Sequence, residues 1–122
     1  PSLYYGDEAG LFGYRDPFNR GCFPWDSPDE ELTAFFRELG ALRRLHPFLA
    51  SASLRFVEVT SDVFSFVRAG GEGERLFAAV NRSPSPRTPR LPAGTEPSRM
   101  EVLFGSGTPL ALPGYGFLVM RF

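Results

Sequence analysis

The spacing of the hydrophobic positions changes once along the chain, near residue 50. Before that point, apolar residues recur at steps of three and four, so that they would form one stripe along a helix. The stripe consists of Leu32, Phe35, Phe36, Leu39, Leu42 and Leu45. From Leu54 on, short β-branched and aromatic runs alternate with turn residues, which is typical of strands. The pattern predicts one long helix followed by a β region.

The residues at both ends of the helical stripe are those that favour helix ends. Ser27 can cap the helix, Pro28 suits the first helical position, and Glu30 stands at capping-box spacing from Ser27. Asp29 and Glu30 also suit the positive end of the helix dipole. Pro47 cannot continue a helix. We therefore expect a helix from about Pro28 to Leu45.

The β region contains six short runs that we expect to be strands, at residues 54–59, 63–68, 75–80, 101–104, 110–112 and 117–122. Residues 69–74 contain three glycines and predict a hairpin loop. The Ser- and Pro-rich stretch 81–92 predicts an edge or a connection, because proline cannot donate to a strand ladder. Short strands with turns at this spacing predict an antiparallel β-sandwich with Greek-key-like returns over residues 52–122.

The beginning of the chain has the pattern of a functional site and not of a purely structural segment. Residues 1–5 form a continuous apolar run, which we interpret as a buried strand of the parallel type. The run stops at Gly6 and is followed by the carboxylates Asp7 and Glu8. A loop of some twenty residues then extends to Asp26, and structural connections are usually shorter. Ligands gather at the carboxyl ends of parallel strands, so we expect any chemistry in this loop.

Three motifs in this order resemble one enzyme family. Pro1-Ser2-Leu3-Tyr4-Tyr5-Gly6-Asp7-Glu8 is similar to the P-x-x-Y-Y-G-x-E segment at the eighth barrel strand of the alpha-amylase family of glycoside hydrolases. Asp16-Pro17-Phe18-Asn19-Arg20 and Phe23-Pro24-Trp25-Asp26 resemble its continuation in neopullulanase, cyclomaltodextrinase and maltogenic amylase. The segment from Leu42 to Pro47 and the closing run from Pro113 to Phe117 also resemble family sequence.

The resemblance implies a mostly β chain with one long helix. Residues 1–51 would be the last strand, substrate loop and helix of a catalytic (β/α)8 barrel, and residues 52–122 the carboxyl-terminal β-sandwich. A whole barrel takes about 250 residues, so most of it, the amino-terminal part, is expected to be missing from these 122 residues. Because the chain starts at Pro1 without an initiator methionine, we expect a processed or truncated product.

The resemblance assigns no catalytic residue to this chain. The family's nucleophile, acid/base and third carboxylate lie on earlier strands and match no position here. Asp7 and Glu8 are adjacent on what begins as a strand, so their side chains should diverge. Retaining hydrolysis needs two carboxyl groups about 5 to 5.5 Å apart. We therefore expect no maltose release from starch or cyclodextrin by this chain alone.

The substrate-binding candidates are Asp16, Arg20, Glu8, Tyr5 and Trp25. Asp16 and Arg20 resemble the family's pair that binds glucose hydroxyls; the alternative is a surface ion pair without a function. In the whole barrel Glu8 would orient a catalytic neighbour or bind a loop backbone; the alternative, at least as well supported, is a structural hydrogen bond. Tyr4, Tyr5 and Trp25 can stack on pyranose rings, but aromatic residues are more often part of the core, and core packing is the interpretation that we favour.

The composition of the chain limits the kinds of binding partner and the cellular compartment that the sequence predicts. Thirteen Lys and Arg against 14 Asp and Glu give a net charge of −1 without a basic stripe, which excludes a nucleic-acid footprint. No run reaches the roughly 18 apolar residues of a membrane span. The single Cys22 forbids an internal disulfide and mildly favours a reducing, cytoplasmic compartment. Asp7, Glu8 and Asp16 are too irregularly spaced to predict a metal site; Ca²⁺ belongs at most to the intact enzyme.

Two classes of function follow. In the first, the chain is the carboxyl-terminal segment of an α-glucan-acting retaining hydrolase whose partners are an α-glucan or cyclodextrin and the missing barrel. In the second, it is a stand-alone carbohydrate-binding or protein-interaction β-sandwich. A free-standing sandwich needs neither a barrel-type strand nor an amphipathic helix, so the sequence favours the first. A transglycosylase-like relative, a homodimer and the bond specificity all stay open.

Overall fold

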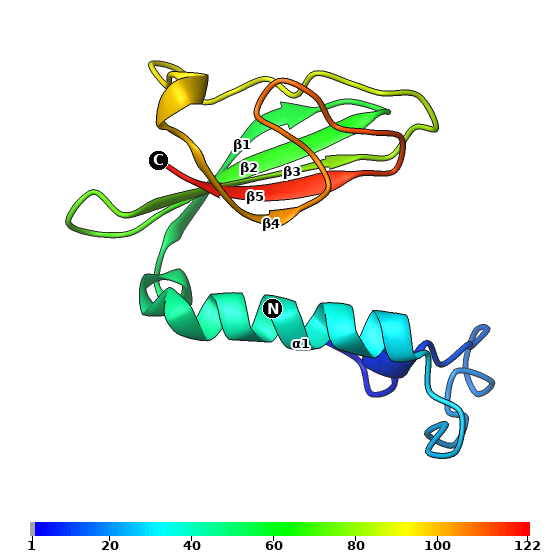
Figure 1. The fold of residues 1–122 in the computed structure, drawn as a ribbon. Helices are drawn as coiled ribbons and strands as arrows, with labels where there is room; N and C mark the ends of the chain where they lie inside the picture. The colour runs from blue at the N-terminus through cyan, green and yellow to red at the C-terminus, as the bar shows by residue number, and fades with distance from the viewer. Residues whose placement is uncertain (1) are drawn as a thin grey trace. The chain divides into compact units, whose positions relative to one another are not determined.

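A computed structural model describes residues 2–122, and Pro1 lies outside them. The chain falls into two compact units, Pro1–Leu45 and His46–Phe122, and each is described by itself. Most of the regular structure is antiparallel β-sheet, accompanied by one long helix, as expected (Figure 1). The domain boundary between residues 51 and 52 stays a prediction, because compactness alone does not define a domain.

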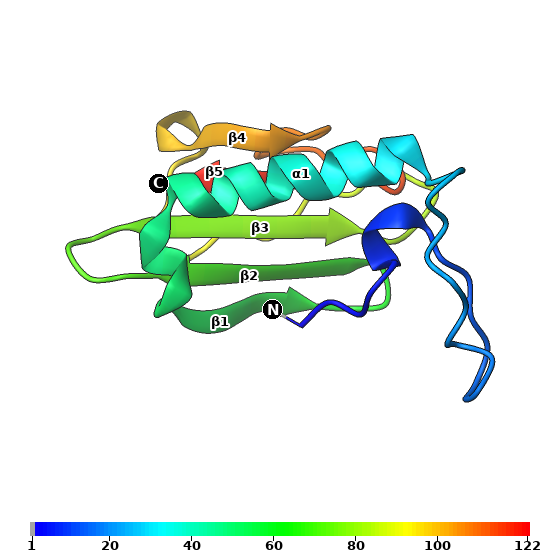
Figure 2. The ribbon, with the colours of Figure 1, turned by 90° about the horizontal axis from the view of Figure 1, so that it is seen from below.

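The first unit contains the 3₁₀ turn η1, Asp7–Ala9, and the helix α1, Glu30–Leu45. The strand expected at residues 1–5 is absent from its described part: residues 2–4 are irregular and exposed, and a turn follows at Tyr5 and Gly6. Figure 2 shows this segment entering η1 directly. A parallel strand needs hydrogen-bonded neighbours, and no strand lies within residues 2–45. The prediction of a buried strand is therefore wrong for these residues in this structure.

Helix α1 ends at Leu45 as expected, but Asp29 and not Ser27 caps its start. The Asp29 carboxylate accepts a hydrogen bond from the Leu32 N–H (2.9 Å), three residues into the helix. Asp29 is itself held by its N–H, which donates to the Ala9 carbonyl (3.0 Å). The contact with η1 thus selects the cap between two residues of suitable type. No residue of α1 is buried.

The second unit begins with the 3₁₀ turn η2, Pro47–Ala50, and contains one five-stranded antiparallel sheet. The strands are β1 Ser53–Val59, β2 Val63–Ala69, β3 Arg75–Asn81, β4 Glu101–Gly105 and β5 Phe117–Arg121, with the short turn η3 at Pro97–Arg99. Their order is β1-β2-β3-β5-β4 (Figure 1). Five of the six predicted strands are therefore confirmed to within one residue.

The sixth predicted strand, at residues 110–112, is wrong. This stretch makes only isolated bridges, Arg87 with Leu112 and Thr108 with Ala111. The layer over the sheet, residues 82–100 and 106–116, is therefore mostly irregular chain and not a second regular sheet. Prolines at several positions of this layer explain the difference, because they lack the N–H that a ladder requires.

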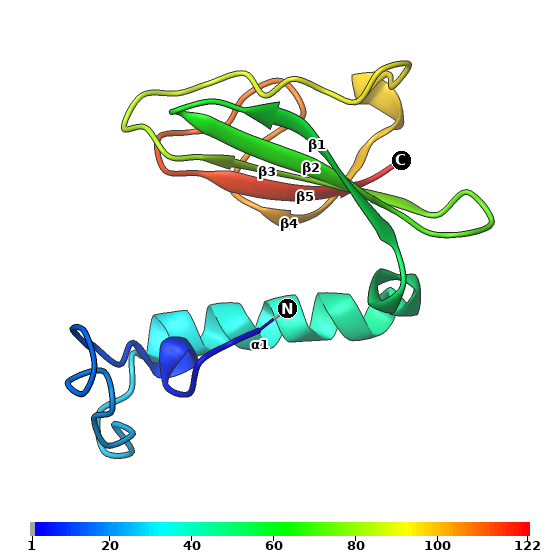
Figure 3. The same ribbon diagram turned by 180° about the vertical axis from the view of Figure 1, so that it is seen from behind.

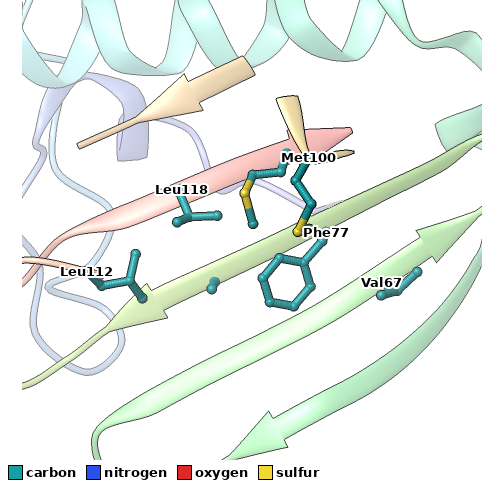
Figure 4. Close-up of a cluster of buried hydrophobic side chains, with 7 residues drawn as sticks. Val67, Phe77, Met100, Leu112 and Leu118 are labelled. Atoms are coloured by element: carbon teal, nitrogen blue, oxygen red, sulfur yellow. The ribbon is translucent and has the colours of Figure 1, made fainter. Parts of the chain in front are cut away.

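One face of the sheet and the irregular layer enclose the core. Neighbouring strands place Val67, Phe77 and Met120 side by side, and the layer adds Met100 and Leu112 from the other side (Figure 4). The Phe77 and Met120 side chains are fully buried. Burial of this apolar area is the main force that holds the layer on the sheet.

Asn81, at the end of β3, ties the same layer down by hydrogen bonds. Its side-chain NH₂ donates to the carbonyls of Ser85 and Pro113, both at 2.8 Å. Its side-chain oxygen accepts from the N–H and the hydroxyl of Ser83, both at 2.9 Å. A buried amide with this many partners stabilises one arrangement of the irregular chain.

The other face of the sheet is also apolar, and we call it the phenylalanine face. The strand register places on it Phe56, Phe64, Phe66, Ala78, Val80, Phe104, Phe117 and Val119. The rings of Phe56 and Phe64 are 5.4 Å apart, and those of Phe104 and Phe117 are 5.3 Å apart. Phe56 is 57% exposed. A sheet with one solvated face would carry polar residues at such positions.

Candidate functional site

The loop between η1 and α1 has two arms that are tied together at their base. The Tyr5 hydroxyl donates to the Gly21 carbonyl (2.8 Å), sixteen residues further along the chain. Closer to the helix, the N–H of Asp29 donates to the Ala9 carbonyl, and the Thr33 hydroxyl donates to the Glu8 carbonyl (2.9 Å). These three hydrogen bonds each join residues far apart in the chain, so together they close the loop into a compact structure.

The tip of the loop, residues 13–20, is also ordered by the backbone. A Cβ on Gly13 would lie 2.8 Å from the Cα of Asn19, so the two arms meet at a distance that only glycine allows. Within the tip, the N–H of Phe18 donates to Arg15 (3.0 Å) and the N–H of Arg20 donates to Pro17 (3.1 Å). The side chains at the tip are therefore carried on a defined turn.

Asp16 and Arg20 meet at this tip, as their spacing predicts. An Asp16 carboxylate oxygen lies 2.7 Å from an Arg20 guanidinium nitrogen, and the two side chains are 61% and 67% exposed. An ion pair this exposed contributes little to stability. It leaves one carboxylate oxygen and several guanidinium N–H groups facing solvent, where they can bind the hydroxyls of a polar ligand.

Tyr4 and Tyr5 do not lie in a core. They are 50% and 45% exposed, and their rings are 4.8 Å apart. Loss of solvent around the Tyr5 hydroxyl, together with the neighbouring Tyr4 and Cys22, raises the pKa of Tyr5, so its hydroxyl keeps the proton that it donates to Gly21. The prediction of core packing is wrong for both tyrosines in this structure, because about half of each side chain is exposed; Tyr5 instead closes the loop.

Trp25 also differs from the expected core packing, whereas the prediction for the Glu8 side chain stays open. Trp25 is 81% exposed and contacts the ring of Phe23, 4.5 Å away, so it is not a core anchor in the described chain. Glu8 lies in η1, and its backbone carbonyl accepts the bond from Thr33. The neighbouring Asp7 carboxylate accepts from the Tyr4 N–H (3.0 Å). The structure thus gives the Asp7 carboxylate a local role, and the ligand roles of Glu8 and Trp25 stay predictions.

Three further exposed aromatic rings of the loop are not among the predicted binding residues. Phe12, Tyr14 and Phe18 are 95%, 86% and 72% exposed. Their signal in the sequence was their position: aromatic residues inside a long Gly- and Pro-rich loop have no regular element to pack against. Tyr14 and Phe18 flank Asp16, so the tip combines apolar ring faces with a charged pair.

The part of the chain that the structure describes contains neither a metal-binding cluster nor a helix that could span a membrane. Within residues 2–122, no three His, Cys, Asp or Glu side chains are grouped so that they would hold a metal ion. No helix of the described part has the length and apolar character of a bilayer span.

Known proteins similar to this chain include an amylopullulanase and a cyclomaltodextrinase. The amylopullulanase of Thermoanaerobacter thermohydrosulfuricus is 39% identical over 77 residues, covering 63% of this chain and 5% of that protein. The cyclomaltodextrinase of a Bacillus species is 32% identical over 98 residues, covering 77% of this chain and 17% of that protein. The chain is a relative of the alpha-amylase-family glycoside hydrolases. It spans a small part of the length of these relatives. No family model matches it.

A solved structure extends the relation to the alpha-amylase family over the whole chain. The debranching enzyme of Nostoc punctiforme, from crystals soaked with acarbose, superposes with a TM-score of 0.80 at 28% identity. The match covers 100% of this chain and 26% of that enzyme. The loop between η1 and α1, which we call the tied loop, and the second unit, His46–Phe122, which we call the β unit, therefore both have counterparts in that enzyme.

Proposed function

We propose that the chain is the carboxyl-terminal part of a retaining glycoside hydrolase that acts on α-glucans, and that it is not itself catalytic. Residues 1–51 would complete the catalytic barrel and supply a substrate loop, and residues 52–122 would stabilise the barrel. The observation that carries the proposal is the tied loop, which presents Asp16 and Arg20 to solvent as a pair.

The chemistry of the pair suits a sugar. A carboxylate accepts hydrogen bonds and a guanidinium donates them, so the two together can bind neighbouring hydroxyls of one glucose unit. Each side chain also holds the other in position. The names of the relatives refer to pullulan, amylose-type and cyclic maltodextrin substrates, which favours an α-glucan or a cyclodextrin as the ligand.

The β unit fits a supporting role because both faces of its sheet are apolar. One face is covered by the irregular layer, but the phenylalanine face carries five phenylalanines, and Phe56 on its outer strand is largely exposed. Exposed apolar surface of this kind marks an interface. We infer that this face is an interface within the intact enzyme. The reading frame and mass of the native protein test this arrangement, since an upstream barrel with three suitably placed acids is expected.

The binding role is tested by Arg20→Gln and Asp16→Asn in the native protein. Each variant should raise the KM for maltoheptaose about tenfold or more, while the unfolding midpoint stays unchanged because the pair is exposed. Arg15→Gln is the matched control, since Arg15 is an exposed arginine of the same tip outside the pair. An unchanged KM in both Arg20→Gln and Asp16→Asn would contradict the proposal.

A further inference from the structure

One hollow of the β unit lies far along the chain from the loop. It has a volume of about 540 Å³ and opens where the loop between β2 and β3 meets η2 and the end of β5. Figure 3 shows this hairpin loop extending past the end of the sheet. The volume falls within the range of about 300 to 1,000 Å³ that is usual for ligand pockets. We call it the hairpin-end hollow.

One wall of the hairpin-end hollow is a phenylalanine ring held in a fixed place. Phe48 packs directly on Gly70, where an added Cβ would come within 2.7 Å of the ring. The turn that carries Phe48 is fastened by Arg68, whose guanidinium donates to the carbonyls of Leu49 (2.9 Å) and Ala52 (2.8 Å). The ring therefore keeps its position without a ligand.

A second ring and a row of charges complete the wall. Phe122 lines the hollow, with the Arg75 guanidinium carbon 6.0 Å from the centre of its ring. Arg121 pairs with Glu101 in the same wall. Arg75 makes no ion pair with any residue from 2 to 122, so its donors stay available to a ligand.

The charges around the hollow cancel. Its lining contains three arginines, at positions 75, 99 and 121, and three glutamates, at positions 72, 74 and 101. An anion would need a positive excess, and a cation would need carboxylates without arginines between them. A neutral ligand with many hydroxyls can use both the donors and the acceptors, and its apolar ring faces can lie on phenylalanine.

We propose that the hairpin-end hollow is a second carbohydrate site, distinct from the Asp16–Arg20 loop, that binds a neutral oligosaccharide. Phe48 and Phe122 supply the apolar surface, and Arg75 with the paired Glu101 and Arg121 supplies hydrogen bonds to hydroxyls. Its proposed role is binding, not catalysis. It holds whether or not the loop binds substrate, because the two sites share no residue.

The test uses the native protein with maltoheptaose as the probe. Hydrogen exchange measured by mass spectrometry should show protection of residues 70–76 and 117–122 when the oligosaccharide is present in large excess. The protection should persist in Arg20→Gln, where the loop site is weakened. In Arg75→Ala, which removes the guanidinium that makes no ion pair, the same degree of protection should require an oligosaccharide concentration about fivefold higher or more.

Two controls make the result decisive. Arg55→Ala removes an exposed arginine of β1 outside the hollow. It should change the oligosaccharide concentration that gives the same protection by less than about twofold. Inorganic phosphate at the same concentration should give no protection. Absence of protection with maltoheptaose, equal protection with phosphate, or an unchanged concentration dependence in Arg75→Ala with an intact unfolding midpoint would each overturn the proposal.

Discussion

Ser65 and Ser83 are both buried serines of the β unit, but only Ser83 has hydrogen-bond partners. The Ser83 hydroxyl donates to Asn81 or to the carbonyl of Ser85, each 2.9 Å away, whereas the fully buried Ser65 hydroxyl has no partner within residues 2–122. Ser65→Ala should therefore leave the free energy of unfolding unchanged or raise it, and Ser83→Ala should lower it by about 1 to 3 kcal/mol. Urea denaturation measures the free energy of unfolding of both variants, and an equal loss in the two would refute the predicted difference.

Asp62 makes the stability of the β unit depend on acid pH. Its carboxylate accepts from two guanidinium nitrogens of Arg87, at 2.9 and 2.8 Å, and from Ser61, and these bonds hold the pKa of Asp62 below its ordinary value. A lowered pKa in the folded state contributes stability that is present above the unfolded value and is lost as pH falls through the folded one.

The unfolding midpoint should therefore fall as pH drops below about 4, the ordinary range of an aspartate. In Asp62→Asn this fall should be shallower, because the neutral amide has no proton to take up. Thermal unfolding followed by circular dichroism from pH 6 to pH 2 tests the difference. Asp26→Asn, an exposed aspartate in the other unit, serves as the control, and identical curves for wild type and Asp62→Asn would be evidence against the coupling.

At the scale of elements, the start of α1 depends on which residue caps it. Asp29→Ala should lower helix stability by about 1 kcal/mol, because the Leu32 N–H loses its acceptor. Ser27→Ala should have almost no effect, although Ser27 is an equally suitable cap by type. Chemical denaturation followed at 222 nm separates the two variants. A larger loss in Ser27→Ala would mean that the observed cap is not the one that stabilises the helix.

Regular elements were predictable where the signal is local. The period of three and four between Leu32 and Leu45 requires no partner to be recognised, and neither does the alternation in β1 or β5. The expectations failed where partners decide. Residues 2–5 are as apolar as a strand but have no neighbour to pair with, and residues 110–112 pair only through isolated bridges because proline-rich chain lies opposite.

At the scale of the whole molecule, the prediction concerns activity. The 122-residue chain on its own should release no maltose from starch or cyclodextrin, because a retaining hydrolase needs two opposed carboxyl groups and no position here matches the family's catalytic motifs. A reducing-sugar assay with the native protein as the positive control measures this. If the purified chain, free of contaminating amylase, released maltose, the prediction that none of its carboxylates is catalytic would be wrong.

Sequence alone determined the type and order of the regular elements and the meeting of Asp16 with Arg20, because these depend on spacings of a few residues. Tertiary structure decided the insertion of β5 between β3 and β4, the bond from Tyr5 to Gly21 and the hairpin-end hollow. Each of these joins segments far apart in the chain. Their free energy comes from contacts that exist only after folding, so no local pattern encodes them.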